Sequence, residues 1–490
     1  MDTKTSPENR FLYLSVWSFQ IGNPEDCREY AKLAKELGFD GIGFIVTWDR
    51  IEPNKDQFDW YWLDKCLDIF TSYDLKLTLG LMFWTGYLSW RSDLCLQQTE
   101  GGSIYSFDSQ RGSMVCLNDE ATLLQVRDAL SAWAQHTMER YGSSIVKYSA
   151  QFSVYGEVEY SPVATPVDYS PSEQRAFRNY MRARAGGLDA INRDYELNLA
   201  NWDEFEALPL NQLLARSDYD WLVFRQQTLI KINQLVAGTI HAVAPDKLVA
   251  MQVGSVWDTA AATLRGVYDP YLISRDVDVL HIDDAPGWPH DFSCDLTESM
   301  IPDRLLAQEL DGAWQTQAIP DLYLRQARMT GEAGVTIMNT ANWTPATIKQ
   351  WSAALFSKYR TLFKDATVRP LAPQDRAILY NTADFISRQQ RSPQDTVLGG
   401  TYSKLSQGGK LRVRFISDSM ILANPQILDE LNAGLYLGRE STMRFDPRVA
   451  EILAKATCPL YFEGIKPKIT DPFGHPLATE VEEQLLARMQ

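Results

Sequence analysis

Acidic residues recur where short apolar runs of this sequence end. Glu157 and Glu159 follow the run IVKYSAQFSVY (145–155), and other acids stand at the ends of similar runs. The acids at the ends of these runs are Asp49, Glu52, Glu157, Asp283, Asp284 and Glu309. Two carboxyl groups can divide acid–base work, since one donates a proton while the other attacks carbon or activates water. The pattern therefore raises the question of whether Glu157 or Glu159 is a catalytic acid.

Aromatic residues gather at the same positions. The chain has 14 tryptophans, and large flat side chains suit stacking against sugar rings as well as core packing. Those just past apolar runs are Trp48, Trp84, Trp90, Tyr155, Trp257, Trp288, Trp314 and Trp343. A single glutamate at a strand end is more often a solvated residue than a catalytic one. Trp60 and Trp62 lie within a predicted helix and are expected to be core residues. Paired acids ringed by tryptophans nevertheless favour glycoside hydrolysis.

Other chemistries find less support. His136, His241 and His475 are predicted to be structural, and His281 has no identifiable nucleophile beside it. The sequence has no glycine-rich phosphate loop and no GxSxG motif. Its six cysteines are scattered without zinc spacing, which predicts reduced thiols. Asp283, Asp284 and His290 could bind a metal, but their spacing is not diagnostic, so we expect no metal site and no cofactor.

Eight apolar runs separated by amphipathic segments must position these residues. The runs span 11–17, 41–48, 75–84, 145–155, 247–254, 276–283, 304–309 and 334–339. Strand–helix alternation with strands apolar throughout predicts a parallel (β/α)8 TIM barrel, whose active site lies at the carboxyl ends of the strands. An open doubly wound sheet is the alternative, but no run is followed by GxGxxG.

Two domains are predicted. Residues 1–367 would form the catalytic barrel, with an insertion at about 160–218, and VRPLAPQD (368–375) is typical of a proline-bearing link. Residues 368–490 would form a small α/β (flavodoxin-like) domain with no catalytic motif.

Charge narrows the range of partners. There are 63 acidic against 47 basic residues, a net charge of −16, which argues against nucleic acid and against anionic membranes. No apolar run reaches the ~18 residues of a membrane span, and the polar start MDTKTSPENR lacks the features of a signal peptide. We therefore expect a cytoplasmic protein.

Several stretches resemble glycoside hydrolase family 42, the β-galactosidase-like members of the retaining clan A. WDRIEPNKDQFDWYWLDKCLDIF is similar to that family's second-strand signature, and LGLMFWTGYLSW to its third strand. FRNYMRARAGGLDAINRDYELNLANWDEF resembles its insertion after strand four. The resemblance covers most of residues 10–365.

The resemblance implies roles for individual residues. FSVYGE (152–157) occupies the frame of the family's acid/base, which places Glu157 in that role, and LLAQELDGAW places Glu309 at the nucleophile. Glu332 is a rival nucleophile but precedes the last strand. The implied sugar-binding positions are Trp48, Asp49, Trp84, Tyr155, Gly156, Glu159, Asp283, Trp288, Trp314 and Trp343.

The sequence also departs from the family pattern. Gly156 stands where the family has the asparagine that binds the sugar's 2-hydroxyl, so we expect room for a 2-linked or 2-substituted sugar. GEVEY locally resembles the acid stretch of family 14 β-amylases, which are inverting enzymes. The family's cysteine metal cluster is absent, while the tail resembles its oligomerisation domain, which implies a homo-oligomer (dimer or trimer).

The resulting hypothesis is an exo-acting, retaining, β-galactosidase-like glycosidase that acts on oligosaccharides without a cofactor. An inverting or transglycosylating enzyme on the same barrel is one alternative. A non-catalytic carbohydrate-binding protein is the other.

Overall fold

The computed structural model describes most of the chain. Described are residues 11–160, 168–184, 186–207, 219–254, 256, 265–284, 290–301, 304–311, 336–339, 345–346, 377–388, 397–408 and 410–490. For some of these, including Asp283 and Glu309, only the backbone is described. None of the helices in these ranges is long and apolar enough to cross a membrane.

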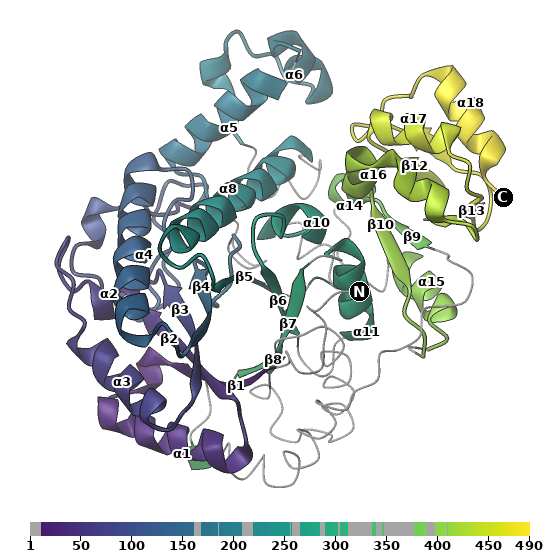
Figure 1. Ribbon diagram of the computed structural model, residues 1–490. Coiled ribbons are helices and arrows are strands. Elements are labelled where there is room, and N and C mark those ends of the chain that lie inside the picture. The colour runs from purple at the N-terminus through teal and green to yellow at the C-terminus, as the bar shows by residue number, and fades with distance from the viewer. Residues whose placement is uncertain are drawn as a thin grey trace.

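Eight parallel strands close into a barrel in chain order (Figure 1). They are β1 (Leu12–Trp17), β2 (Gly41–Thr47), β3 (Lys76–Met82), β4 (Ile145–Gln151), β5 (Leu248–Val253), β6 (Val279–Asp284), β7 (Leu305–Asp311) and β8 (Thr336–Asn339). Pairing of β8 with β1, where Leu12 lies opposite Thr336, closes the ring. The predicted barrel is confirmed, and the open doubly wound sheet is wrong.

Helices cover the outside of the barrel and explain why the outward face of its strands is apolar. The principal ones are α1 (Cys27–Leu37), α3 (Tyr61–Ser72), α4 (Glu120–Tyr141) and α8 (Tyr219–Val243), with the short α2 (Trp48–Ile51) after β2. Helix α1 ends at Gly38, whose φ of 76° is the left-handed cap that glycine favours. Helix α4 begins where the Asp119 carboxylate accepts a hydrogen bond from Thr122 N.

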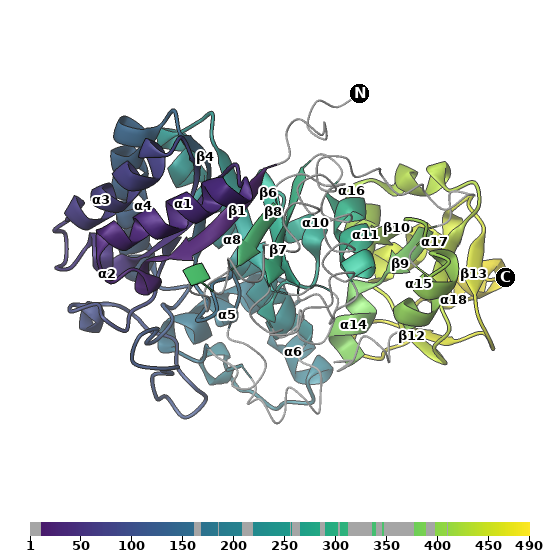
Figure 2. The same ribbon diagram turned by 90° about the horizontal axis from the view of Figure 1, so that it is seen from below.

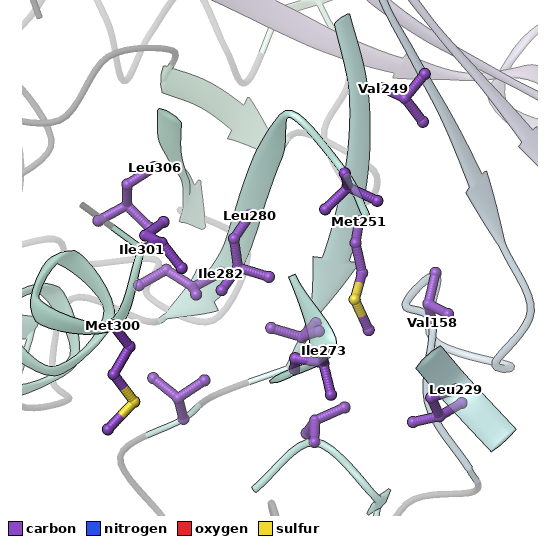
Figure 3. Close-up of a cluster of buried hydrophobic side chains, with 14 of the residues drawn as sticks. Val158, Leu229, Val249, Met251, Ile273, Leu280, Ile282, Met300, Ile301 and Leu306 are labelled. Atoms are coloured by element: carbon purple, nitrogen blue, oxygen red, sulfur yellow. The ribbon is translucent and has the colours of Figure 1, made fainter. Parts of the chain in front are cut away.

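The outer faces of β5, β6 and β7 build one side of the hydrophobic core (Figure 3). Met251 packs toward Ile273 of the short helix α10 (Pro270–Ile273), and Leu280 lies beside Ile282. Helix α11 (His290–Met300) covers the neighbouring stretch of β6 and β7. These contacts fix the strands whose carboxyl ends carry the candidate site.

The segment after β4 forms a helical excursion at one end of the barrel. Helices α5 (Pro171–Arg184) and α6 (Leu188–Asp194) share an aromatic cluster with the start of α8, in which Phe177 packs against Trp221 and Phe224. This excursion corresponds to the predicted insertion at about 160–218, although residues 161–167 and 208–218 lie outside the described ranges.

A second, smaller parallel sheet follows the barrel. Its strands run in the order β10 (Arg414–Ser417), β9 (Ala377–Tyr380), β11 (Leu435–Gly438), β13 (Leu460–Phe462). Strand β12 (Thr442–Arg444) pairs separately with β14 (Lys468–Thr470). The accompanying helices are α14 (Thr382–Arg388), α15 (Val397–Leu405), α16 (Asp418–Ala423), α17 (Pro447–Lys455) and α18 (Thr479–Arg488). The predicted boundary at 367/368, the link 368–375 and the preceding helix lie outside the described residues.

Helix α11 joins the two sheets, and Figure 2 shows it between the barrel and the smaller sheet. Asp295 Oδ2 accepts hydrogen bonds from Val413 N at 2.9 Å and from the Tyr402 hydroxyl at 2.8 Å. Ser299 Oγ accepts one from Phe415 N at 3.0 Å. Because β10 is an edge strand, these side chains occupy N–H groups that would otherwise be open for pairing.

Candidate active site

The carboxyl ends of the strands bring the predicted acids to one face of the barrel. Glu157 follows the end of β4, and on the paired strands β6 and β7 Asp283 lies directly opposite Glu309. Of Asp283 and Glu309 only the backbone is described. Outside the described residues lie Trp288, Trp314, Trp343 and the rival nucleophile Glu332.

A tight turn centred on Ser153 carries Glu157. The Ser153 hydroxyl donates to Glu157 Oε2 at 2.7 Å, and its oxygen accepts from the N–H groups of Tyr155, Gly156 and Glu157 at 3.2, 3.3 and 3.1 Å. The Glu157 carbonyl in turn accepts from Phe152 N and Ser153 N at 3.0 and 2.8 Å. One serine thus fixes both the backbone of the turn and the direction of the carboxyl group.

Glu157 lies in a dry environment, with only 4% of its surface exposed. Burial raises the pKa of the Glu157 carboxyl, and the Ser153 hydrogen bond and the charges of Arg265 and Arg111 lower it in part. A raised pKa is the property that a general acid requires.

Glu159 is buried as well, with 1% of its surface exposed. Its Oε2 accepts a hydrogen bond from Gly254 N at 3.2 Å, and its Oε1 lies 3.6 Å from Arg265 Nε. Burial raises the pKa of Glu159 to about 8, with Arg265 lowering it and the Glu157 charge raising it further. Neither glutamate is therefore a solvated loop charge.

Gly156 departs from the expectation that it leaves open space. Its φ is 112°, which L side chains rarely adopt, and a Cβ there would lie 2.7 Å from Trp17 Cη2 and 3.5 Å from Met82 Cε. The indole of Trp17 fills the space that a side chain at 156 would take. The prediction that this glycine makes room for a sugar substituent is wrong for that reason.

Aromatic rings from β1 and β3 pack behind the turn. Trp17 lies 5.5 Å from Phe19 and 5.9 Å from Trp84, between ring centroids. Trp84 Nε1 donates to Ser153 O at 3.1 Å, so this predicted sugar-binding residue supports the turn. Sequence reasoning missed Trp17 and Phe19, although Trp17 is the last residue of β1 and the strand-end rule would have found it.

The remaining described candidates differ in exposure. Trp48 is fully buried, donates from Nε1 to Glu52 Oε2 at 2.7 Å, and is a core residue, so it lines no open subsite. Asp49 is half-buried, and burial raises the pKa of its carboxyl. Tyr155 is 44% exposed and contacts Phe107 edge-on, which leaves it available to a ligand.

Below the turn, the barrel interior is lined by polar side chains. Lys147, Gln151, Gln252 and His281 surround a cavity of about 20 Å³, room for roughly one water molecule. Burial, with Lys147 nearby, lowers the pKa of His281 well below its ordinary value, so this ring is neutral. The layer forms a polar floor beneath the carboxyl ends of the strands.

A separate group of side chains could hold a metal ion. In the described part of the chain, ligand atoms of Cys116, Asp168 and Glu173 lie within 4.8 Å of one another, all buried. Glu173 already accepts hydrogen bonds from Tyr160 and Asn118, at 2.8 and 2.7 Å. Its pKa, raised to about 8 by burial, is that of a neutral hydrogen-bonded acid.

Comparison with known proteins identifies a family. The sequence profile described as beta-galactosidase, glycoside hydrolase family 42, matches residues 17–300. The beta-galactosidase BgaA of Thermus sp is 25% identical over 272 residues, which cover 53% of this chain and 39% of that protein. The chain thus spans about two fifths of the length of this curated relative.

Solved structures share the fold. Beta-galactosidase from the psychrophilic Marinomonas ef1 superposes with a TM-score of 0.71 at 15% identity, over 97% of this chain and 79% of that one. The catalytic domain of beta-amylase from Paenibacillus polymyxa gives 0.56 at 16% identity, over 71% of this chain and 98% of that one.

Proposed function

The chain belongs to glycoside hydrolase family 42, and from this premise we propose that it hydrolyses terminal β-galactosidic bonds of oligosaccharides. The observation that carries the proposal is Glu157, a buried carboxyl group with a raised pKa, held by a hydrogen-bonded turn at the carboxyl end of β4. A proton donor in a dry wall at this edge of a barrel suits cleavage of a glycosidic bond.

We assign the nucleophile to Glu309. It stands opposite Asp283 near the carboxyl end of β7, two residues after Ala307, which is buried with Tyr13 and Val279. Because alternate residues of a strand share a face, position 309 lies on the same face of β7 as Ala307. That placement supports Glu309 over Glu332.

The proposed reaction has two steps and retains the anomeric configuration. Glu157 first donates its proton to the glycosidic oxygen while Glu309 attacks the anomeric carbon, which forms a covalent glycosyl-enzyme. Glu157 then accepts a proton from water, which attacks that carbon and releases Glu309. This course requires the two carboxyl groups to be ~5–5.5 Å apart, whereas inversion requires ~6.5–9.5 Å.

Inversion and transglycosylation on the same barrel remain the rival courses, and the fold shared with a beta-amylase makes the distinction worth testing. Proton NMR of the first anomer released from lactose decides between them. The β-anomer of galactose supports retention, and the α-anomer contradicts it. Galactosyl-lactose among the products would indicate transfer.

Two isosteric variants test the catalytic roles. Glu309→Gln should lose at least ~10²-fold in kcat/KM on both lactose and an aryl galactoside. Glu157→Gln should lose ~10²–10⁴-fold on lactose but much less on an aryl galactoside, whose leaving group needs no proton. Glu52→Gln, a buried glutamate bonded to Trp48, is the control and should keep its activity.

The same variants address the non-catalytic alternative, which the loss of the family's asparagine at Gly156 favours. If the wild type cleaves nothing in a glycoside panel while all three variants bind galactosides like the wild type, the chain is a sugar-binding protein.

Further proposals follow for the surroundings of the site. Asp49, Tyr155 and Asp283 would contact the sugar directly, whereas Trp84 acts through the turn. With Trp17 beside Gly156, a preference for 2-substituted sugars has no steric basis left. The six free cysteines support a cytoplasmic location, and the smaller sheet is the region we propose for homo-oligomer contacts.

A further inference from the structure

Two buried glutamates and one arginine lie together at the carboxyl ends of β4 and β5, and the proposed reaction uses only one of the glutamates. Glu159 is the more deeply buried of the two, yet it stands two residues beyond the position that the proposed reaction assigns to the acid.

The main chain holds Glu159 on two sides. Val158 N donates to Gln252 O at 2.7 Å, and Tyr160 N donates to Arg265 O at 3.0 Å. Gly254 N donates to the Glu159 carboxyl group itself at 3.2 Å. A side chain anchored in this way between β5 and Arg265 has little freedom to turn toward solvent.

Gly254 makes the approach of Arg265 possible. A Cβ at this position would overlap the Arg265 guanidinium and lie 3.0 Å from Glu159 Oε2. The requirement is steric, since Gly254 is not among the residues with positive φ. The guanidinium is the end of a flexible side chain, so a methyl group at 254 would push it aside without blocking the fold.

Among the side chains that the structure describes here, the charges do not balance when both glutamates are ionised. Glu159 faces the positive Arg265 and the negative Glu157. Arg265 and Arg111 both lower the pKa of Glu157, and Arg111 itself pairs with Asp108 Oδ2 at 3.4 Å. Two buried carboxylates beside one close guanidinium would leave a negative charge in a dry environment, which is strongly unfavourable. A proton kept on one of the two carboxyl groups removes this charge, and acids that interact strongly titrate together.

We propose that Glu159 is a positioning residue: with Arg265 it keeps one proton within the carboxyl pair, so that Glu157 and Glu159 gain and lose protons as one unit. This inference rests on the proposed acid/base role of Glu157. Its consequence is that Glu157 can still donate a proton at a pH where a single carboxyl group beside an arginine would be ionised.

The pH dependence of kcat/KM on lactose tests the inference. Glu159→Gln removes the partner carboxyl, so the alkaline limb should move to lower pH by at least about one unit. Arg265→Met removes the cation and should move the limb to higher pH. Gly254→Ala, which displaces the guanidinium without changing any charge, should move it the same way by less.

Shifts in opposite directions support the coupling, since a merely structural role would lower the rate and leave the limb in place. Unmoved limbs in all three variants overturn the inference.

A second readout does not depend on activity. Infrared difference spectra between about pH 6 and about pH 9 detect a buried protonated carboxyl group as it ionises. The signal should be altered in both Glu157→Gln and Glu159→Gln. If the infrared signal of Glu157 titrates in Glu159→Gln as it does in the wild type, the inference fails even when lactose is cleaved. If the coupling is present but no glycoside is hydrolysed, only the proposed function fails.

Discussion

At the scale of single residues, Gly156 explains how the chain departs from its family pattern beside the proposed acid. A left-handed φ and the Trp17 ring in the Cβ direction both require glycine. The residue thus belongs to the turn geometry that aims Glu157, and the sequence-based interpretation of it as open space missed the neighbouring strand that fills the gap.

Gly156→Ala should therefore lower stability and activity together. Strained backbone at a non-glycine residue costs ~1–3 kcal/mol, and overlap with Trp17 adds to that cost. Gly187→Ala is a matched control, because Gly187 has a φ of 120° and no atom lies within 4 Å of the place that its Cβ would take.

Urea unfolding of the two variants separates strain from overlap. Gly156→Ala should be the less stable, and a second change, Trp17→Leu, should recover part of the difference. Equal losses in Gly156→Ala and Gly187→Ala would mean that the Trp17 contact contributes nothing.

At the scale of elements, the apolar runs predicted every barrel strand because a strand covered on both faces leaves a strong local pattern. The surroundings of the aromatic residues at the strand ends leave no comparable pattern in the sequence. Trp48 and Trp17 both stand at strand ends, yet Trp48 is a core residue and Trp17 packs behind the turn that carries Glu157. That difference depends on which side chains arrive from other strands, which local sequence does not record.

The same limit applies to the candidate acids. The strand frame predicted the position of Glu157 after β4, but not its pKa, which burial raises and which Ser153 and Arg265 lower in part. Arg265 comes from a segment more than a hundred residues later, so the coupling of Glu157 to Glu159 became visible only with the fold.

The contact between α11 and the edge strand β10 gives a prediction about elements. Asp295→Ala should destabilise the protein by about 1–3 kcal/mol for each buried hydrogen bond that it removes, here those from Val413 N and from the Tyr402 hydroxyl. Tyr402→Phe removes only one of these bonds and should cost less. Asp295→Asn keeps an acceptor oxygen and serves as the control.

Denaturant unfolding followed by circular dichroism measures these costs. A loss in Asp295→Ala no larger than in Asp295→Asn would show that the hydrogen bonds to β10 do not stabilise the junction.

At the scale of the whole molecule, buried acids with raised pKa values occur at separate places. Burial raises the pKa of Glu159 to about 8, that of Glu173 to about 8 and that of Asp269 to about 7. In the unfolded chain such groups ionise near pH ~4. Between these limits the folded protein binds more protons than the unfolded chain does.

Stability should consequently fall as pH rises from about 5 to about 8, because the slope of the unfolding free energy with pH follows the difference in bound protons. Urea midpoints measured across this range should decrease steadily. Glu173→Gln stays neutral at every pH and keeps the shape of the side chain between Tyr160 and Asn118, so it should flatten the slope by up to about one proton.

Glu463→Gln is the control. It changes an exposed carboxyl group whose pKa is lowered by hydrogen bonds from Lys404 and Tyr436, so it should leave the slope unchanged in this range. A midpoint that rises from pH 5 to pH 8 would mean that the buried acids are already ionised in the folded state, and that cations placed near them outweigh their burial.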